Sequence, residues 1–166
     1  MKSKRIPKEL YYLNIAREIA KRSTCLRRRF GAILVKNDSI IAAGYAGAPR
    51  GTPHCIDLGR CRRAELNVPS GQRYELCRGV HAELNAIISA ARTGAPTVGS
   101  KMYLIGENYD GTLAQPKPCS VCRRAIINAG IEEVIVPLIG VPNGIKRYKV
   151  KNWIKENKKD CKKGGR

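Results

Sequence analysis

The sequence predicts a three-layer α/β/α fold, in which helices cover both faces of a mixed sheet. Along the second half of the chain, short apolar runs typical of strands alternate with apolar helical patterns. This order builds parallel strands whose two faces are both buried. The chain has 166 residues, of which 43% are hydrophobic, and this is enough for one core. We therefore expect one domain over residues 1–150, followed by a basic C-terminal helix and tail over residues 151–166.

The first part of the chain predicts a helix and a hairpin. Over residues 7–22, apolar residues recur at helical spacing, and a proline suits the first turn. Two short apolar runs follow, over residues 31–36 and 39–45. Asn37 and Asp38 lie between them, and both residue types tolerate tight turns. We expect these two runs to pair as antiparallel strands.

The later elements alternate between helix and strand. The pattern over residues 81–93 has apolar side chains at i, i+3, i+4 and i+7, and a glycine ends it. A strand is predicted over 101–106, a second buried helix over 119–129 and a further strand over 133–138. Residues 46–80 contain five glycines, three prolines and three cysteines with little periodicity. A loose loop of this length is implausible in a compact domain, so we expect an additional cross-link to hold it in one conformation.

Two motifs predict a zinc site. His81 and Glu83 open one predicted helix, and Pro118, Cys119 and Cys122 open the next. Cysteines at i and i+3 share a helix face, and a helix N-terminus favours the thiolate that zinc requires. With one imidazole added, the metal has three protein ligands, and its fourth tetrahedral position is left for water, as in catalytic zinc sites.

Glu83 is predicted to move protons. It is too close to His81 in sequence to be a convenient further ligand on the same helix face. We expect it to take a proton from the metal's water and deliver protons to the substrate. A Cys-x-x-Cys pair alone is also typical of redox sites and of structural zinc. Its combination with His81 and Glu83 favours the catalytic interpretation.

A His-x-Glu motif followed by Pro-Cys-x-x-Cys is the signature of the zinc deaminases, and the chain resembles the cytidine and deoxycytidylate deaminase superfamily. The likeness is strongest to the deoxycytidylate deaminase branch. It runs through TCLRR (24–28), GYAGAPRG (44–51), ELCRGVHAELNAI (75–87) and INAGIEEVIV (127–136). The resemblance implies a five-stranded central sheet, a catalytic zinc ion and hydrolysis of a cytosine nucleotide, foremost dCMP to dUMP and ammonia. It also implies a homo-oligomer, either a hexamer or a dimer.

The chain departs from the family pattern at two places. Ala46 stands where the family commonly has an asparagine linked to substrate binding. The segment 107–117, which leads into Pro118, is also longer than the link that many members have. Because it runs directly into the predicted zinc helix, we expect it to border the substrate.

A second metal site is predicted from cysteines that bracket the unpatterned segment, namely Cys25, Cys55, Cys61 and Cys77. Four thiolates, or three with His54, would close a structural zinc site that orders residues 46–80. The resemblance supports a second zinc ion in this region. The alternative is that these small side chains only pack in the interior. Cys161, in the basic tail, is expected to be a free thiol.

Substrate contacts are predicted for a few cationic and aromatic or amide side chains. A nucleotide phosphate requires cations at the mouth of the pocket, and the planar fork of arginine suits its geometry. The candidates are Arg28, Arg50 and Arg92, and Arg92 resembles an arginine near the substrate in the deoxycytidylate branch. The alternative is that these arginines are only solvated. The candidates for contacts with the base are Tyr45, Asn85 and Tyr109.

The formal net charge of +19, from 32 Lys and Arg against 13 Asp and Glu, favours an anionic partner. A solvated thermophilic surface is the alternative, but such surfaces usually enrich Glu together with Lys. Two other functions stay open: a deaminase acting on single-stranded nucleic acid or tRNA, and a non-catalytic zinc-stabilised nucleic-acid-binding module. Against the nucleic-acid deaminase, aromatic residues form only 5% of the chain and do not interleave with arginines as a stacking platform requires. Glu83 also argues against a purely structural site.

The expected location is the cytoplasm, with no membrane partner. No stretch approaches the roughly 20 apolar residues needed to cross a bilayer. The basic N-terminus is not followed by the apolar run of a signal peptide. In a reducing compartment, the seven cysteines favour metal ligation over disulfides.

Overall fold

The computed structural model describes residues 5–69 and 71–163, with side chains described as far as Lys158. Its centre is a five-stranded sheet in the order β2-β1-β3-β4-β5. The strands are β1 (Arg29–Lys36), β2 (Ser39–Tyr45), β3 (Lys101–Glu107), β4 (Glu133–Pro137) and β5 (Ile145–Lys149). β3 and β4 are parallel, and the other neighbouring pairs are antiparallel. The mixed five-stranded sheet is thus confirmed.

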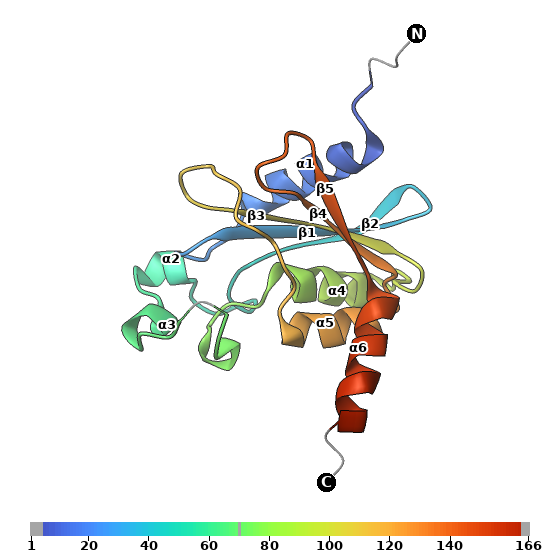
Figure 1. Ribbon diagram of the computed structural model, residues 1–166. Helices are drawn as coiled ribbons and strands as arrows, with labels where there is room; N and C mark the ends of the chain where they lie inside the picture. The colour runs from blue at the N-terminus through green and yellow to red at the C-terminus, as the bar shows by residue number, and fades with distance from the viewer. Residues whose placement is uncertain (1–4, 70, 164–166) are drawn as a thin grey trace.

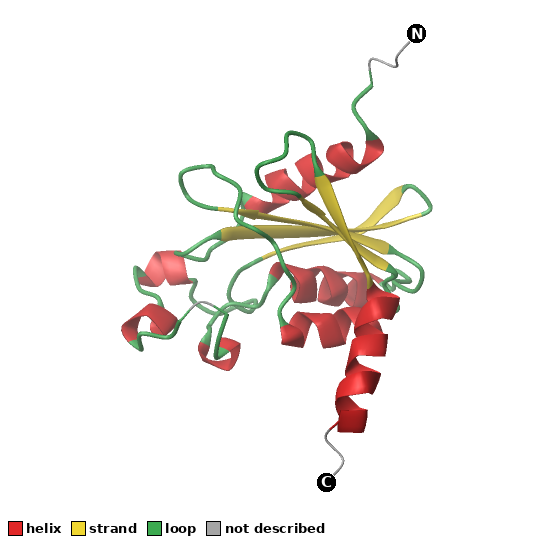
Figure 2. Cartoon of the chain, viewed as in Figure 1, coloured by secondary structure: helices red, strands yellow, loops and turns green. Residues whose placement is uncertain are grey.

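Helices cover both faces of the sheet (Figure 1). One face is covered by α1 (Lys8–Ala20), and the other by α4 (Ala82–Thr93), α5 (Ser120–Asn128) and α6 (Val150–Lys163). Two hydrophobic clusters fill the two interfaces, one centred on α1 and one shared by α4, α5 and α6. Figure 2 shows the resulting three layers, with strands between helices. The predicted three-layer α/β/α fold is confirmed.

The hairpin between β1 and β2 follows the sequence prediction. Asn37 and Asp38 both have positive φ, 48° and 59°, which is the backbone of a tight two-residue hairpin turn. The edge strand β5 was not predicted from the residue pattern. In this strand, Ile145 and Tyr148 are partly buried, and the other three residues are exposed lysines and an arginine. A charged edge strand has no apolar alternation to reveal it.

The segment 46–80 contains three short helices that the sequence did not predict: α2 (Cys55–Leu58), α3 (Arg62–Glu65) and η1 (Tyr74–Leu76). Its two ends are joined by reciprocal backbone hydrogen bonds between Gly47 and Val80, of 3.1 and 2.7 Å. The segment projects beside the start of α4 (Figure 1). The hydrogen bonds between Gly47 and Val80 therefore hold together the two ends of a segment that is otherwise irregular.

The C-terminal helix α6 packs on the body through its first turn. Trp153 is 5% exposed and belongs, with Val150, to the cluster that α4 and α5 share. The proposed boundary between residues 150 and 151 stays a prediction, and the side chain of Cys161 lies outside the described residues. No helix in the described part of the chain is both long and apolar enough to cross a membrane.

Gly44 lets α4 lie directly against β2. A Cβ atom on Gly44 would be 2.2 Å from the backbone nitrogen of Ala86 and 2.6 Å from the backbone oxygen of Ala82. These are backbone atoms of α4, so a side chain at Gly44 would push the whole helix away from the sheet. Since His81 precedes α4, this contact also determines where the predicted metal ligand lies.

We expect Gly44→Ala to lower the free energy of unfolding by about 1–3 kcal/mol, because the added methyl group overpacks the α4 interface. Chemical denaturation followed by circular dichroism measures the change. Gly79→Ala is the matched control, since a Cβ there meets its nearest neighbours at an ordinary 3.7 Å. Equal stability of the two variants would contradict the close-packing argument.

Candidate active site

The predicted zinc ligands lie at the N-termini of two adjacent helices. His81 is the N-cap of α4 and Cys119 is the N-cap of α5, and both have extended backbone angles. The amide of Asn85 donates hydrogen bonds to the carbonyl oxygens of Tyr45 (2.7 Å) and Val80 (3.4 Å). This amide ties the start of α4 to the end of β2. The backbone around His81 is thereby held in place before any metal binds.

The geometry of the three ligand atoms fits a metal ion. Nδ1 of His81 lies 3.6 Å from Sγ of Cys119 and 3.3 Å from Sγ of Cys122. A tetrahedral zinc ion places a nitrogen and a sulfur ligand roughly 3.5 Å apart. Within the residues described, these three are the group of potential ligands whose atoms all lie within 4.8 Å of one another. The structure therefore brings together the predicted catalytic zinc ligands.

Of the three candidate ligands, Cys119 is the one whose pKa favours the form that zinc binds. The pKa of Cys119 is lowered to about 4, because the Cys122 thiol donates a hydrogen bond to it and His81 lies beside it. The hydrogen bond with Cys119 raises the pKa of His81 and that of Cys122. Cys119 is therefore a thiolate already, and thiolate is the form that binds zinc.

Glu83 has the environment expected of a proton carrier. It is 5% exposed, and burial raises the pKa of its carboxyl group. The charge of His81 and a hydrogen bond with Cys122 favour its charged form, whereas the charge of Cys119 disfavours it. A carboxyl group with a raised pKa can both accept and release a proton near neutral pH. Its predicted role stays a prediction, and its position is compatible with it.

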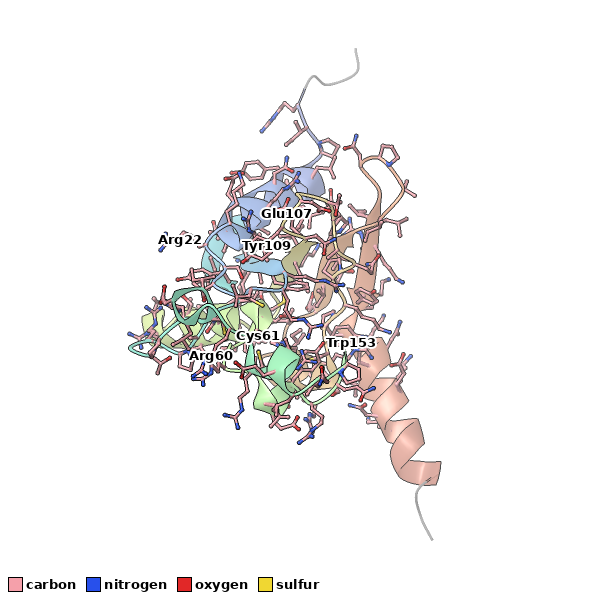
Figure 3. All side chains as sticks on the ribbon, turned by 90° about the vertical axis from the view of Figure 1, so that its left-hand side faces the viewer. Arg22, Arg60, Cys61, Glu107, Tyr109 and Trp153 are labelled. Carbon is pink, nitrogen blue, oxygen red and sulfur yellow. The ribbon has the colours of Figure 1, made fainter. Side chains whose placement is uncertain are left out.

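The four cysteines of the predicted second site line one cavity of about 140 Å³, and His81 lines it too. Burial raises the pKa of Cys55 and of Cys77. In the part of the chain that is described, however, their sulfurs do not form a group of three within 4.8 Å. The alternative ligand His54 is not among the lining residues, and its Nδ1 is 3.2 Å from Oγ1 of Thr24. Figure 3 looks at this end of the molecule, with Cys61 near the centre.

The candidate phosphate ligands are dispersed. Arg28 lines the cavity together with Arg27 and His81. Arg50 is exposed in a turn and is not among the lining residues. Arg92 lies in the last turn of α4, eleven residues after His81 and hence roughly 16 Å away along the helix axis. Of the three candidates, Arg28 is the one that lines the same cavity as His81.

The candidate base contacts have other partners in the structure. Asn85 uses its amide on backbone carbonyls, and one of these belongs to Tyr45. The hydroxyl of Tyr109 donates to the carbonyl oxygen of Cys25, and the Arg29 guanidinium lies 4.6 Å from the Tyr109 ring centroid. Tyr109 thus contacts the backbone of Cys25, although it is not among the residues that line the cysteine cavity. Its contact with a base stays a prediction.

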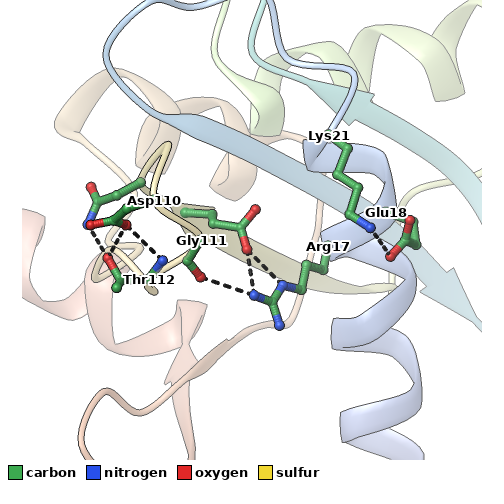
Figure 4. A network of polar contacts seen from close by, with 8 residues as sticks. Arg17, Glu18, Lys21, Asp110, Gly111 and Thr112 are labelled. Carbon is green, nitrogen blue, oxygen red and sulfur yellow. Dashed lines mark hydrogen bonds and ion pairs between the residues drawn. The ribbon is translucent and has the colours of Figure 1, made fainter.

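The connection between β3 and α5 is pinned to α1. Arg17 donates two hydrogen bonds to Glu107, of 2.8 and 2.6 Å, and one of 3.1 Å to the carbonyl oxygen of Gly111. Asp110 accepts hydrogen bonds from the backbone and the hydroxyl of Thr112 (Figure 4). The longer segment noted in the sequence is therefore an ordered turn, and it leads from the end of the central strand β3 to the candidate metal ligand Cys119.

Sequence reasoning missed two residues around the site. Arg63 and Tyr74 line the cysteine cavity with His81. Arg63 is buried, and the ring of Tyr74 contacts the imidazole of His81. Neither residue stands in a regular pattern, since both belong to the aperiodic segment 46–80. Its composition therefore carried no signal for them.

Comparison with known proteins identifies the family. A family model described as the cytidine and deoxycytidylate deaminase zinc-binding region matches residues 7–138. The chain belongs to this deaminase family. It is 37% identical over 125 residues to the deoxycytidylate deaminase of Schizosaccharomyces pombe, which covers 75% of this chain but only 35% of that protein. With the deoxycytidylate deaminase of Mycobacterium phage D29, the identity is 35% over 131 residues, covering 76% of this chain and 91% of the relative.

A solved structure agrees with this assignment. The dCMP deaminase from the cyanophage S-TIM5, in complex with dCMP and dUMP, has a TM-score of 0.56 and 25% sequence identity. The match covers 80% of this chain and 82% of that one. The resemblance to the deoxycytidylate deaminase branch is confirmed, while the catalytic and substrate-binding roles of individual residues stay predictions.

We expect Cys122→Ala to reduce bound zinc by about one ion per chain, because the three-ligand site loses one of its sulfurs. Elemental analysis of the purified protein measures the change. Ser120→Ala is the matched control, since Ser120 lies between the two cysteines and is exposed. Unchanged zinc content in Cys122→Ala would remove this residue from the metal site.

Proposed function

We propose that this deaminase hydrolyses the amino group of dCMP, releasing dUMP and ammonia. The observation that carries the proposal is a buried carboxyl group, Glu83, beside the ligand group of His81, Cys119 and Cys122. Relatives named deoxycytidylate deaminase, and the cyanophage enzyme in complex with dCMP and dUMP, support the choice of substrate. The residues present fit a zinc ion in ligand type, number and spacing.

The proposed reaction uses Glu83 twice. A zinc ion held by the three ligands would supply a water that ionises near neutral pH. Glu83 would accept a proton from the attacking water as its oxygen bonds to C4, and would pass that proton to ring atom N3 of cytosine. Glu83 would then take the remaining proton from the hydroxyl group on C4 and deliver it to the amino group, so that the C4–N bond breaks, ammonia leaves and C4 keeps the oxygen as a carbonyl. The raised pKa of the buried carboxyl group suits both transfers.

Glu83→Gln is expected to retain zinc and fold but to lower turnover at least ~100-fold, since it removes the proton carrier and leaves every ligand in place. Turnover is measured by the conversion of dCMP to dUMP, and zinc content by elemental analysis. If the variant turned over at nearly the unmodified rate with zinc bound, Glu83 would have no part in the reaction.

We propose Arg28 as the ligand of the substrate phosphate, because it lines the cavity that His81 also lines. Arg50 and Arg92 stay candidates for the phosphate ligand, although neither of them lines this cavity. Arg92 is too far along α4 to serve the metal site of its own chain, so it would act only across an interface between subunits. This alternative fits the homo-oligomer, hexamer or dimer, that the family resemblance implies and that we retain as a proposal.

The phosphate should make dCMP a better substrate than deoxycytidine by roughly 100-fold in kcat/KM, because an unpaired guanidinium in the pocket costs about 2–4 kcal/mol. Arg28→Ala is expected to narrow this ratio. Arg22→Ala, in the exposed turn after α1, is the control. If Arg92→Ala narrows the ratio and Arg28→Ala does not, the phosphate ligand comes from a neighbouring subunit instead.

We also propose a second, structural zinc ion bound by Cys25, Cys55, Cys61 and Cys77. The support is that all four line one cavity. Besides burial, the neighbouring thiols of Cys25 and Cys61 contribute to the raised pKa of both Cys55 and Cys77. Because the sulfurs do not converge into a tight group in this structure, the metal would have to draw them together. The free energy of metal binding at such a site would stabilise the folded conformation of residues 46–80.

Cys77→Ser is expected to lower the zinc content by about one ion per chain and to lower the melting temperature, because the fourth ligand of a closed tetrahedral site is lost. Elemental analysis and thermal unfolding measure the two effects, with Cys161→Ser as the control. One zinc per unmodified chain, together with four freely titratable thiols, would rule out the second site.

A second candidate substrate is a base in single-stranded nucleic acid or tRNA, favoured by the net charge of +19. Faster deamination of a cytosine-bearing oligonucleotide than of dCMP, with a steep decrease as salt rises, would favour it. Apart from this alternative substrate, we propose no nucleic-acid partner for the protein. We propose a cytoplasmic location, because thiol ligands require a reducing compartment.

A further inference from the structure

Arg63 is buried where an arginine is normally exposed. It belongs to the four-residue helix α3, and its exposed fraction is 6%, whereas the neighbouring Arg62, Ala64 and Leu66 are exposed. The helix therefore turns a charged side chain inward and apolar side chains outward. Burying a charge is costly unless its donors are satisfied, so this orientation requires specific contacts.

The contacts of Arg63 hold the loop that precedes η1. Nη2 donates hydrogen bonds of 2.7 Å to the carbonyl oxygen of Pro69 and 2.7 Å to that of Gln72. The guanidinium carbon lies 4.7 Å from the ring centroid of Tyr74. No ion pair to a carboxylate is found for Arg63 among the residues described, and its Nε is buried without a hydrogen-bond partner there. Its charge is thus compensated by carbonyl oxygens and an aromatic ring.

Tyr74 links this clamp to the metal site. Its ring centroid is 4.7 Å from that of His81, and the two ring planes stand at 88°, an edge-to-face contact. Tyr74 also lines two hollows, the cysteine cavity and a groove of about 840 Å³ that Cys119 and Arg123 line as well. The tyrosine therefore stands between the two spaces that reach the metal ligands.

We propose that Arg63 and Tyr74 are positioning residues for His81: Arg63 clamps the Tyr74 ring, and this ring fixes the orientation of the imidazole that binds the catalytic metal. The proposal rests on the metal site of the proposed function. Because Arg63 belongs to the segment that carries Cys55, Cys61 and Cys77, the order of this segment reaches His81 through these two side chains.

Under this proposal, the effect on metal affinity depends on which side chain replaces Tyr74 or Arg63. Residues that orient a metal-bound histidine typically contribute about 10–100-fold to metal affinity. The contact of Tyr74 with His81 is made by the aromatic ring, so phenylalanine preserves it and leucine does not. Lysine at position 63 loses the planar fork that serves two carbonyl groups and the ring together.

The experiment compares metal binding in four variants: Tyr74→Leu, Arg63→Lys, Tyr74→Phe and Arg62→Ala. The last two are matched controls, one retaining the ring and one removing the adjacent exposed arginine. Cobalt(II) replaces zinc, and its visible absorption bands report the geometry of the ligand set. Subtracting the spectrum of Cys122→Ala isolates the bands of the catalytic site from any cysteine-only site. Titration against a chelator gives the affinity.

Tyr74→Leu and Arg63→Lys are expected to shift the catalytic-site bands and to weaken cobalt binding at least ~10-fold, while both controls match the unmodified protein. Unchanged bands and affinity in folded Tyr74→Leu, or an equal loss in Tyr74→Phe, would overturn the proposal. If Tyr74→Leu does not fold, Arg63→Lys and Tyr74→Phe decide it by the same criteria. Because these measurements do not use turnover, absence of dCMP hydrolysis would refute the proposed function without touching this inference.

Discussion

The site depends on one constraint, the placement of two helix N-termini side by side on one face of the sheet. Gly44 allows the backbone of α4 to touch β2, and the parallel pairing of β3 with β4 makes α5 the crossover helix on the same face. His81 and Cys119 then meet because each caps its helix. Cys122 joins them from the next turn of α5. The packing of the two helices thus brings together candidate ligands from two distant parts of the chain.

Within this arrangement, the pKa values of two neighbouring groups are shifted in opposite directions. Hydrogen bonding lowers the pKa of Cys119 to about 4, whereas burial raises that of Glu83. A thiolate and a protonatable carboxyl group therefore lie beside one another, and a pair with divergent environments is what separates a ligand from an acid or base. The predicted roles of the two residues differ accordingly, since hydrogen bonding has the largest effect on the pKa of Cys119 and burial has the largest effect on that of Glu83.

Most regular elements and the grouping of His81, Cys119 and Cys122 were predictable from the sequence, because periodicity, caps and ligand spacing are local properties. The helix α4 and the strands β1 and β2 have nearly the predicted bounds. The edge strand β5 and the short helices of residues 46–80 were not predictable, since their stability comes from contacts with the rest of the fold and not from a repeating pattern. The same applies to Arg63 and Tyr74. Arg92 illustrates the converse limit, because its distance from His81 follows from helix length, which motif matching ignores.

The basic composition has a second consequence at the cysteine cavity. The charges of Arg63 and Arg78 favour the thiolate forms of Cys77 and Cys55 respectively, but burial outweighs them and raises the pKa of both cysteines. Without metal these thiols stay protonated, so binding a cation must release protons. The surrounding arginines reduce that cost, and they also attract a phosphate. Under the proposed function, these positive charges would favour both the thiolates of the second site and an anionic substrate.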